Sequence, residues 1–331
     1  MTMFSRRSVS KTLAGGLAAA SLSVKAPAVW AQSNMPKVKA AFPPVLDAAI
    51  FHVGKANGMY AAERIEVELI PSPGGVATMS AVAANEFQVG IATVTALILG
   101  AVEGLNFQIV VPTSFVGTGP PDELGGLLIR KGSGMNNGAA LTGKRAGVLV
   151  LNNLPWLCTR LWIDSTGGDS SKVNFVEVPN PQMADALVGG RVDIVASIDP
   201  FFSAAMQSLS EKIEVAAYAY SQTLPNTIIG CAMMTEEFTS KNKDLVMAFA
   251  RGSDKAIDWM IENKGKPELA QIVSSFTRLP PERVLSLLLW PKLSKTVQPA
   301  TIDRVSLAMQ KYGLIKSVPN SASLIFESAL G

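Results

Sequence analysis

The chain has few of the residues on which most catalytic and metal sites depend. Its 331 residues include one histidine and two cysteines. It has no Ser/His/Asp arrangement, no cysteine and histidine spacing of a metal site, and no glycine-rich loop with a lysine for phosphate. The histidine, His52, lies within an amphipathic helical pattern, which favours a packed or surface position over a general base. We therefore expect no catalysis, no metal and no cofactor.

Long apolar runs and blocks of charge are also missing. The sequence is 48% hydrophobic and 17% charged, the balance of a folded globular protein, and the lack of low-complexity segments argues against disorder. Beyond the N-terminal segment, no stretch reaches the roughly 20 apolar residues needed to cross a bilayer. A length of 331 residues suits one large or two medium domains.

The N-terminal residues have the pattern of a secretory signal. A pair of arginines precedes a weakly apolar stretch at residues 12–24 that is rich in alanine, glycine and leucine. Val29 and Ala31 are small enough for the −3 and −1 cleavage positions, and the paired arginines indicate the twin-arginine route. The alternative is an uncleaved anchor, but the apolar stretch is too short to span a membrane. We predict a signal peptide at residues 1–31.

Loss of this segment changes the charge of the chain. The segment carries four basic residues and no acidic one, so the whole-chain charge of +3 less 4 leaves −1. Without a basic surface, we expect neither nucleic acid nor an anionic membrane as a partner. No cysteine directly follows the signal, so a periplasmic protein without a lipid anchor is predicted. Cys158 and Cys231 lie in apolar runs, where two buried free thiols are favoured over a disulfide.

Short apolar strands alternate with amphipathic helices along the rest of the chain. This alternation predicts an α/β fold with mainly parallel sheets. The expected strands are residues 37–42, 67–70, 87–92, 125–131, 143–150, 173–178, 192–196, 213–219 and 228–234. The expected helices are residues 48–62, 76–85, 155–165, 243–262, 267–276, 281–288 and 300–312.

One stretch of this pattern occurs twice. Residues 81–97 and residues 185–201 each contain the end of a helix, a polar turn, a strand and the start of another helix. Sequence identities between the two are almost absent, so a duplication is not shown. The shared order still indicates that the same βαβ unit is used twice, about a hundred residues apart. Two similar lobes are the simplest interpretation.

Strand ends that lead into helix starts are where α/β sheets bind ligands, because the first helical turn has free N–H groups and a positive dipole end. Four such junctions occur, at residues 73–75, 93–95, 151–153 and 198–200. If the two lobes face each other, the four junctions converge on one cleft. The candidate ligand-binding residues at and beside these junctions are Gly74, Gly75, Thr93, Thr95, Asn152, Asn153, Trp156, Asp199 and Phe201.

Structural roles compete with ligand binding at several of these positions. Thr95, Asn153 and Asp199 are good N-cap types, and for Asp199 a cap is favoured over direct ligand contact. Pro200 suits the first position of a helix. Trp156 is either a lid or a core residue. Of Phe201 and its neighbour Phe202, one is expected to pack inward while the other lines the cleft.

Several motifs, in this order, resemble the nitrate/sulfonate/taurine-type (NMT1/THI5-like) substrate-binding proteins of ABC importers. They are GMYAAERIEVEL at residues 58–69, the glycine pair at 74–75, FQVGI at 87–91, GGLLIRKGSG at 125–134, LTGKRAGVLV at 141–150 and the tail at 299–324. Residues 198–200, Ile-Asp-Pro, stand where the family usually has Trp-Glu-Pro or Trp-Asp-Pro. The resemblance covers nearly the whole mature chain.

The resemblance implies a periplasmic binding protein of type II, with two mostly parallel α/β lobes joined by two crossover strands and with extra C-terminal helices. Lobe I would comprise residues 32–118 and 223–331, and lobe II residues 119–222. The hinge would lie near residues 117–119 and 219–222. By matched position the resemblance adds Phe42, after the first strand, and Thr118, in the hinge, to the candidate ligand-binding residues. It further implies a monomeric receptor that binds a small organic solute between the lobes and delivers it to an inner-membrane permease and its ATPase.

Other ligands and other classes stay open. The wider group includes binders of thiamine-precursor pyrimidines, some enzymes share the two-lobe fold, and an extracytoplasmic sensor would have the same sequence features. The chain also departs from the family at Ile198, Val94 and Ala96, and none of the four junctions holds a lysine or arginine. A doubly charged anion would therefore depend on helix dipoles and N–H groups alone. Two roles stay open for Asp199: it accepts an amine or amide N–H, as an amino-sulfonate or a pyrimidine offers, or it caps its helix without contacting the ligand.

Overall fold

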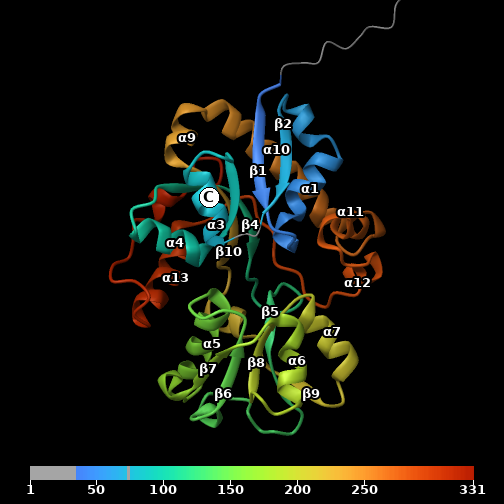
Figure 1. Cartoon of the computed structure of the whole chain (residues 1–331), viewed down its shortest axis with the longest axis vertical. Coiled ribbons are helices and arrows are strands. Elements are labelled where there is room, and N and C mark those ends of the chain that lie inside the picture. Colours follow the sequence, from blue (N-terminus) through green and yellow to red (C-terminus); the bar gives the residue numbers. More distant parts are fainter. Residues whose placement is uncertain (1–34, 73–74) are drawn as a thin grey trace, which may run out of the picture. The chain divides into compact units, whose positions relative to one another are not determined.

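The computed structural model describes residues 35–72 and 75–331 (Figure 1). The predicted signal peptide and Gly74 lie outside the described residues. The remainder is an α/β protein with two five-stranded sheets, here called sheet I and sheet II. In each sheet four strands run in one direction and one strand runs against them, so the expectation of mainly parallel sheets is confirmed.

Sheet I has the strand order β2-β1-β3-β10-β4. The strands are β1 (Lys37–Phe42), β2 (Glu66–Pro71), β3 (Val89–Thr93), β4 (Phe107–Phe115) and β10 (Ile228–Thr235), of which β10 is the reversed one. Residues of β10 alternate between two cores: Ala232 packs with residues of α1 and α10, whereas Cys231 packs with residues of α4. Helices therefore cover both faces of this sheet.

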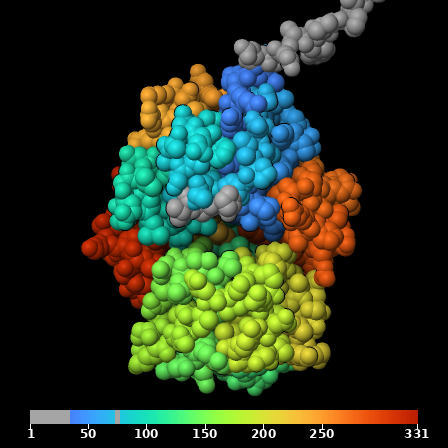
Figure 2. Space-filling view, in the orientation of Figure 1, coloured from blue at the N-terminus to red at the C-terminus, as the bar shows by residue number. Residues whose placement is uncertain are grey.

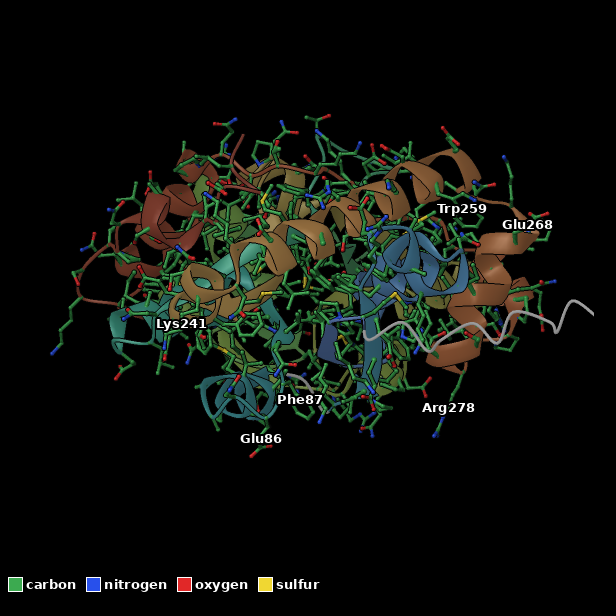
Figure 3. All side chains as sticks on the ribbon, turned by 90° about the horizontal axis from the view of Figure 1, so that it is seen from above. Glu86, Phe87, Lys241, Trp259, Glu268 and Arg278 are labelled. Atoms are coloured by element: carbon green, nitrogen blue, oxygen red, sulfur yellow. The ribbon has the colours of Figure 1, made fainter. Side chains whose placement is uncertain are left out.

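The helices associated with sheet I come from both ends of the chain. They are η1 (Leu46–Ala48), α1 (Ala49–Ala56), α2 (Met59–Ala62), α3 (Gly75–Ala83), α4 (Val94–Val102), α9 (Glu236–Lys241), α10 (Lys243–Asn263), α11 (Pro267–Thr277), α12 (Pro281–Leu285) and α13 (Pro299–Lys311). In Figure 2 the orange surface of α11 and α12 adjoins the blue surface near α1, and α1 contacts α11 directly. Charged side chains such as Lys241, Glu268 and Arg278 extend outward from these helices (Figure 3).

Sheet II has the strand order β7-β6-β8-β5-β9. The strands are β5 (Gly125–Arg130), β6 (Arg145–Val148), β7 (Asn174–Glu177), β8 (Ile194–Ile198) and β9 (Ile213–Ala217), and β5 is the reversed one. Its helices are α5 (Leu154–Ser165), α6 (Asn180–Val188), α7 (Phe201–Leu209) and α8 (Ala219–Thr223). Leu289, from the segment after α12, packs in the core between this sheet and α6 and α7. The C-terminal part of the chain thus contributes to the second sheet as well.

The chain passes between the sheets through two short connections, residues 116–124 and residues 218–227. Both connections leave one sheet at the end where its parallel strands finish, and both enter the other sheet through its reversed strand. We call this end of a sheet, with the loops that follow its parallel strands, the carboxyl rim. The topology therefore joins the carboxyl rim of sheet I to that of sheet II. Two backbone hydrogen bonds link the connections to each other. One runs from the Val116 amide to the Thr227 carbonyl oxygen (2.8 Å) and the other from the Asn226 amide to the Gly117 carbonyl oxygen (3.2 Å).

Some element boundaries differ from the expected ones. The expected helix at 48–62 is interrupted at Gly58, whose φ of 68° favours glycine. The expected strand at 213–219 ends at Ala217, and α8 follows it. The expected helix at 281–288 ends at Leu285. Strand β4 was not anticipated because it contains Pro112, which a sheet tolerates here since β4 is the outermost strand.

Candidate functional site

The carboxyl rim of sheet I brings together several of the predicted site residues. Phe42 is the last residue of β1 and lies opposite Pro71, the last residue of β2, while Thr93 ends β3 beside them. Gly75 begins α3, directly after the loop from β2. These positions are neighbours because β1, β2 and β3 are parallel, so their carboxyl ends lie at the same end of the sheet.

The two threonines of this rim have different roles. The Thr93 side chain is exposed and caps α4, since its hydroxyl accepts a hydrogen bond from the Ala96 amide at 3.3 Å. Thr95 is buried, and its hydroxyl lies 3.1 Å from that of Thr93. The N-cap is therefore Thr93 rather than Thr95, and Thr93 is the one of the two that reaches the surface.

Phe42 is part of the core rather than an open wall. It is buried and stacks on Phe51, with ring centroids 4.3 Å apart. It also lines a surface hollow of about 420 Å³ together with His52 and Arg278. His52 stacks on Phe276 at 3.9 Å, and burial lowers its pKa to about 4, so it is neutral at physiological pH. His52 is therefore half-buried and packed on Phe276, within the packed or surface position that the sequence favoured.

The carboxyl rim of sheet II holds the second group of predicted residues. Asn153 caps α5, as predicted, by accepting a hydrogen bond from the Trp156 amide at 3.0 Å. Asn152 is exposed and has a φ of 64°, a left-handed conformation that asparagine tolerates. Next to them Val150 and Leu151 are large hydrophobic residues with 49% and 39% of their surface exposed. This rim therefore offers both polar and apolar groups.

Trp156 is a core residue. It is 6% exposed and packs edge-on against Phe175 and Tyr312, with ring centroids 5.9 Å and 6.1 Å away. The Arg160 guanidinium lies over its ring at 4.9 Å. Of the two alternatives drawn from the sequence, the structure has the packed tryptophan and not a lid.

Both oxygens of Asp199 are engaged by the protein. Oδ1 accepts a hydrogen bond from the Ser203 amide in the first turn of α7 (2.8 Å), and Oδ2 accepts one from the Leu289 amide (3.0 Å). Burial raises the pKa of this carboxyl. The capping role favoured by the sequence is thus present, and a second role, holding the segment after α12, was not foreseen. Helix α7 begins at Phe201, so Pro200 precedes the helix instead of occupying its first position.

One of the two phenylalanines of α7 packs inward, as expected. Phe202 is buried in the core of sheet II, whereas Phe201 is half-buried. Phe201 lines a hollow of about 290 Å³ with Pro280 and Leu287, which come from the segments around α12. This hollow lies between α7 and the C-terminal part of the chain. Thr118 is exposed in the first connection between the sheets.

Two acidic residues at the rims were missed by the sequence analysis. Asp47, in η1 after β1, accepts a hydrogen bond from the Ser114 hydroxyl at 3.0 Å, and burial raises its pKa to about 6. Glu123, in the first connection, is fully buried, and its Oε1 accepts a hydrogen bond from the Ser221 amide of the second connection at 3.1 Å. Burial raises the pKa of Glu123 to about 7. The available signal for Asp47 was its place between the apolar residues Leu46 and Ala48, whereas Glu123 follows another acid, Asp122, and has no such signal.

Among the described residues, no group of three or more histidine, cysteine, aspartate or glutamate side chains could hold a metal ion. In the same part of the chain, none of the helices has the length and apolar character that crossing a bilayer requires. Cys158 and Cys231 are buried free thiols, as the sequence indicated.

The comparisons with known proteins agree with this architecture. A family model described as NMT1/THI5 like matches residues 46–266. No curated protein sequence matches the chain. The periplasmic aliphatic sulphonate binding protein SsuA from Escherichia coli superposes with a TM-score of 0.74 at 14% sequence identity, over 88% of this chain and 98% of that one.

Two further structures extend the comparison. The periplasmic nitrate-binding protein NrtA from Synechocystis PCC 6803 has a TM-score of 0.64 at 14% identity, over 87% of this chain and 84% of its own. The CA3427 gene product of Candida albicans is described as exhibiting the generic periplasmic binding protein structural fold. It has a TM-score of 0.62 at 16% identity, over 89% of this chain and 98% of its own. The predicted fold class, that of a periplasmic binding protein, is confirmed by these similarities.

Proposed function

Because the chain belongs to the NMT1/THI5-like family, we propose that it is an extracytoplasmic receptor that binds a small organic solute and delivers it to an ABC importer of the nitrate/sulfonate/taurine type. The observation that carries this proposal is the topology of the two connections. They join the carboxyl rims of both sheets, so helix starts and strand ends of the two lobes are directed toward one region. This is where open α/β sheets bind their ligands.

The chemistry of the rims supports binding of an organic solute. Three large hydrophobic side chains, Val45, Val150 and Leu151, are exposed in the loops that follow β1 and β6. Exposed apolar groups beside helix N-termini and a few polar side chains are typical of small-molecule sites. Thr93, Asn152 and Asn153 supply the polar groups in this proposal, with the N–H groups that begin α3 and α5.

In the proposed mechanism, lobe I comprises residues 32–118 and 223–331, and lobe II comprises residues 119–222. The hinge lies within residues 116–124 and 218–227, which contain the two predicted hinge segments. The solute binds to both rims and shifts the population toward a closed form, because it makes contacts with both lobes only in that form. The closed monomer then docks on an inner-membrane permease, and the associated ATPase drives import.

The receptor proposal predicts a ligand that stabilises the folded protein. A solute present at a hundred times its dissociation constant adds about 2.7 kcal/mol to the free energy of unfolding. A thermal-shift screen of the mature protein with amines, pyrimidines, sulfonates, carboxylates and nitrate is expected to reveal such a compound. If no member of any class raises the melting temperature, the receptor proposal is contradicted.

Export is the second testable part of the proposal. We propose that residues 1–31 direct the folded protein to the periplasm through the twin-arginine route. Replacing the pair with lysines (Arg6→Lys with Arg7→Lys) is expected to leave the unprocessed precursor in the cytoplasm, because that route depends on the arginine pair. Cell fractionation measures this, with Lys11→Arg as a charge-matched control that is exported normally. Equal export of the lysine pair variant would rule the route out.

A pyrimidine of the thiamine-precursor type is the alternative solute. It is favoured by the absence of lysine and arginine at the four strand-to-helix junctions and by the acidic residues beside them. An enzyme on the same two-lobe fold is the alternative from another class. It would require a catalytic group at the rims, where the described side chains supply acids, amides and hydroxyls.

A further inference from the structure

Asp47 occupies a central position on the carboxyl rim of sheet I. It lies in η1, which follows β1, and it binds Ser114 near the end of β4. Beneath it runs the start of β10, where Gly230 pairs with Thr93 of β3 on one side and with Ser114 on the other. The ends of three parallel strands and the start of the reversed strand therefore meet around this one carboxylate, which is half-buried.

The backbone of β10 makes room for polar oxygens at this point. A Cβ atom on Gly230 would lie 2.4 Å from Asp47 Oδ2, 2.8 Å from Thr113 Oγ1 and 3.1 Å from Ser114 Oγ. The glycine thus allows three oxygen atoms to gather over the strand. Thr113 is 1% exposed, and its hydroxyl has no hydrogen-bond partner in the described part of the chain. A buried hydroxyl without a partner is costly in a folded protein and calls for an explanation.

The charge of Asp47 is also left without compensation. Burial and the Ser114 hydroxyl account for its shifted pKa, and no lysine, arginine or histidine contributes to it. Cys231, which follows Gly230 in β10, is neutral because burial raises its pKa to about 12. An aspartate with a pKa of about 6 is mostly ionised at neutral pH. A partly buried carboxylate is destabilising unless it is paired, so a purely structural role would be met better by asparagine, which could also accept the Ser114 hydrogen bond.

An anion-binding site needs cationic or N–H donor groups, whereas this rim holds an uncompensated carboxylate. Sulfonate or nitrate would be repelled by an ionised carboxylate at the same rim, and the four strand-to-helix junctions hold no cationic side chain. Asp199, on the rim of sheet II, adds a second carboxylate. One candidate for anion binding is the exposed Arg278, which lines the same hollow as Phe42.

We propose that Asp47 is a ligand-binding residue and that the solute presents to it a protonated amine or amidinium group, with the Thr113 hydroxyl as a neighbouring polar contact. The inference rests on the proposed receptor function and adds the class of solute to it. It sets this chain apart from the sulfonate- and nitrate-binding proteins that share its fold.

The test compares two sets of probes on the mature protein and on two variants. The cationic probes are agmatine, putrescine, histamine and benzamidine, and the anionic probes are ethanesulfonate, nitrate and acetate. We expect a cationic probe to raise the melting temperature of the wild type, and Asp47→Asn to weaken its binding roughly 10- to 100-fold in calorimetry, as loss of a hydrogen bond to a charged group does. Arg278→Gln, the matched control, is expected to leave that affinity within about twofold.

The melting temperature of the ligand-free variant separates binding from structure. If Asp47 serves the ligand, Asp47→Asn melts at the same or a higher temperature than wild type, because an unpaired charge is removed while the Ser114 contact can remain. A lower melting temperature with unchanged cation affinity would overturn the inference. Failure of every cationic probe would also overturn it. If an anion binds, the receptor proposal stands without this inference. If neither these probes nor any compound of the thermal-shift screen binds, both fail.

Discussion

Replacing Asp199 with alanine is expected to lower the free energy of unfolding by about 2–4 kcal/mol. The carboxylate accepts the Ser203 amide at 2.8 Å and the Leu289 amide at 3.0 Å, and alanine leaves both donors without a partner. Loss of a capping side chain costs about 0.5–2 kcal/mol, and loss of a hydrogen bond to a charged group costs about 1.5–3 kcal/mol. Loss of the hydrogen bond from the Leu289 amide also frees the segment after α12, whose Leu289 side chain packs in the core of sheet II.

Chemical denaturation of the purified protein measures this change. Asp199→Asn keeps one good acceptor, so its free energy of unfolding is expected to fall by about half as much as that of Asp199→Ala. Asp185→Ala, on the exposed surface of α6, is the control and should stay within about 0.5 kcal/mol of wild type. An Asp199→Ala protein as stable as this control would show that the two hydrogen bonds contribute nothing to the fold.

Glu123 is expected to give the protein a marked dependence of stability on pH. Its folded-state pKa of about 7 lies above the ordinary glutamate value of 4.5, because the carboxyl is buried between the two connections. The folded state therefore holds a proton that the unfolded state has lost between these two pH values. The contribution of this group is fully present below about pH 4.5 and is lost as the pH rises through 7. The loss amounts to roughly 3 kcal/mol for this shift of the pKa.

The variant Glu123→Gln isolates this contribution. The glutamine side chain cannot ionise, so the free energy of unfolding of this variant should fall less between about pH 5 and pH 8 than it does in wild type. Glu86→Gln, at an exposed position labelled in Figure 3, should follow the wild-type curve. Asp47 and Asp254 also have a raised pKa of about 6 and contribute to the pH dependence of every variant. The quantity to compare is therefore the difference in the free energy of unfolding between variant and wild type at each pH. Parallel curves for Glu123→Gln and wild type would contradict the raised pKa.

The layout of the fold could be predicted from local sequence, since most strands and helices are marked by apolar periodicity and by turn residues. The exceptions have local causes. Strand β4 contains Pro112, which normally argues against a strand. It is tolerated because β4 is the outermost strand of sheet I, and the isolated bridges on its outer side are at Ile109 and Phe115 and not at Pro112. The choice between Thr93 and Thr95 as the N-cap depends on a backbone angle, which two threonines in nearly adjacent positions do not reveal.

The parts of the site that could not be predicted depend on residues far apart in the sequence. Asp47 lies outside the four junctions identified in the sequence, and only its contacts with Ser114 and its closeness to Gly230 mark it as a candidate site residue. Likewise Asp199 could be recognised as a capping residue, but its bond to Leu289 joins positions 90 residues apart. Glu123, in the first connection, likewise accepts its hydrogen bond from the Ser221 amide of the second connection. Such contacts are set by the topology and not by any local pattern.

The central claim is that the two carboxyl rims face each other and close around a solute. Its most direct test is the distance between spin labels at Glu86→Cys and Ser171→Cys, one in each proposed lobe, measured by pulsed electron paramagnetic resonance. Both native cysteines are buried, so these exposed sites can be labelled selectively. With the solute that raises the melting temperature, the account predicts a shorter and narrower distance distribution. An unchanged distribution at saturating solute would contradict it.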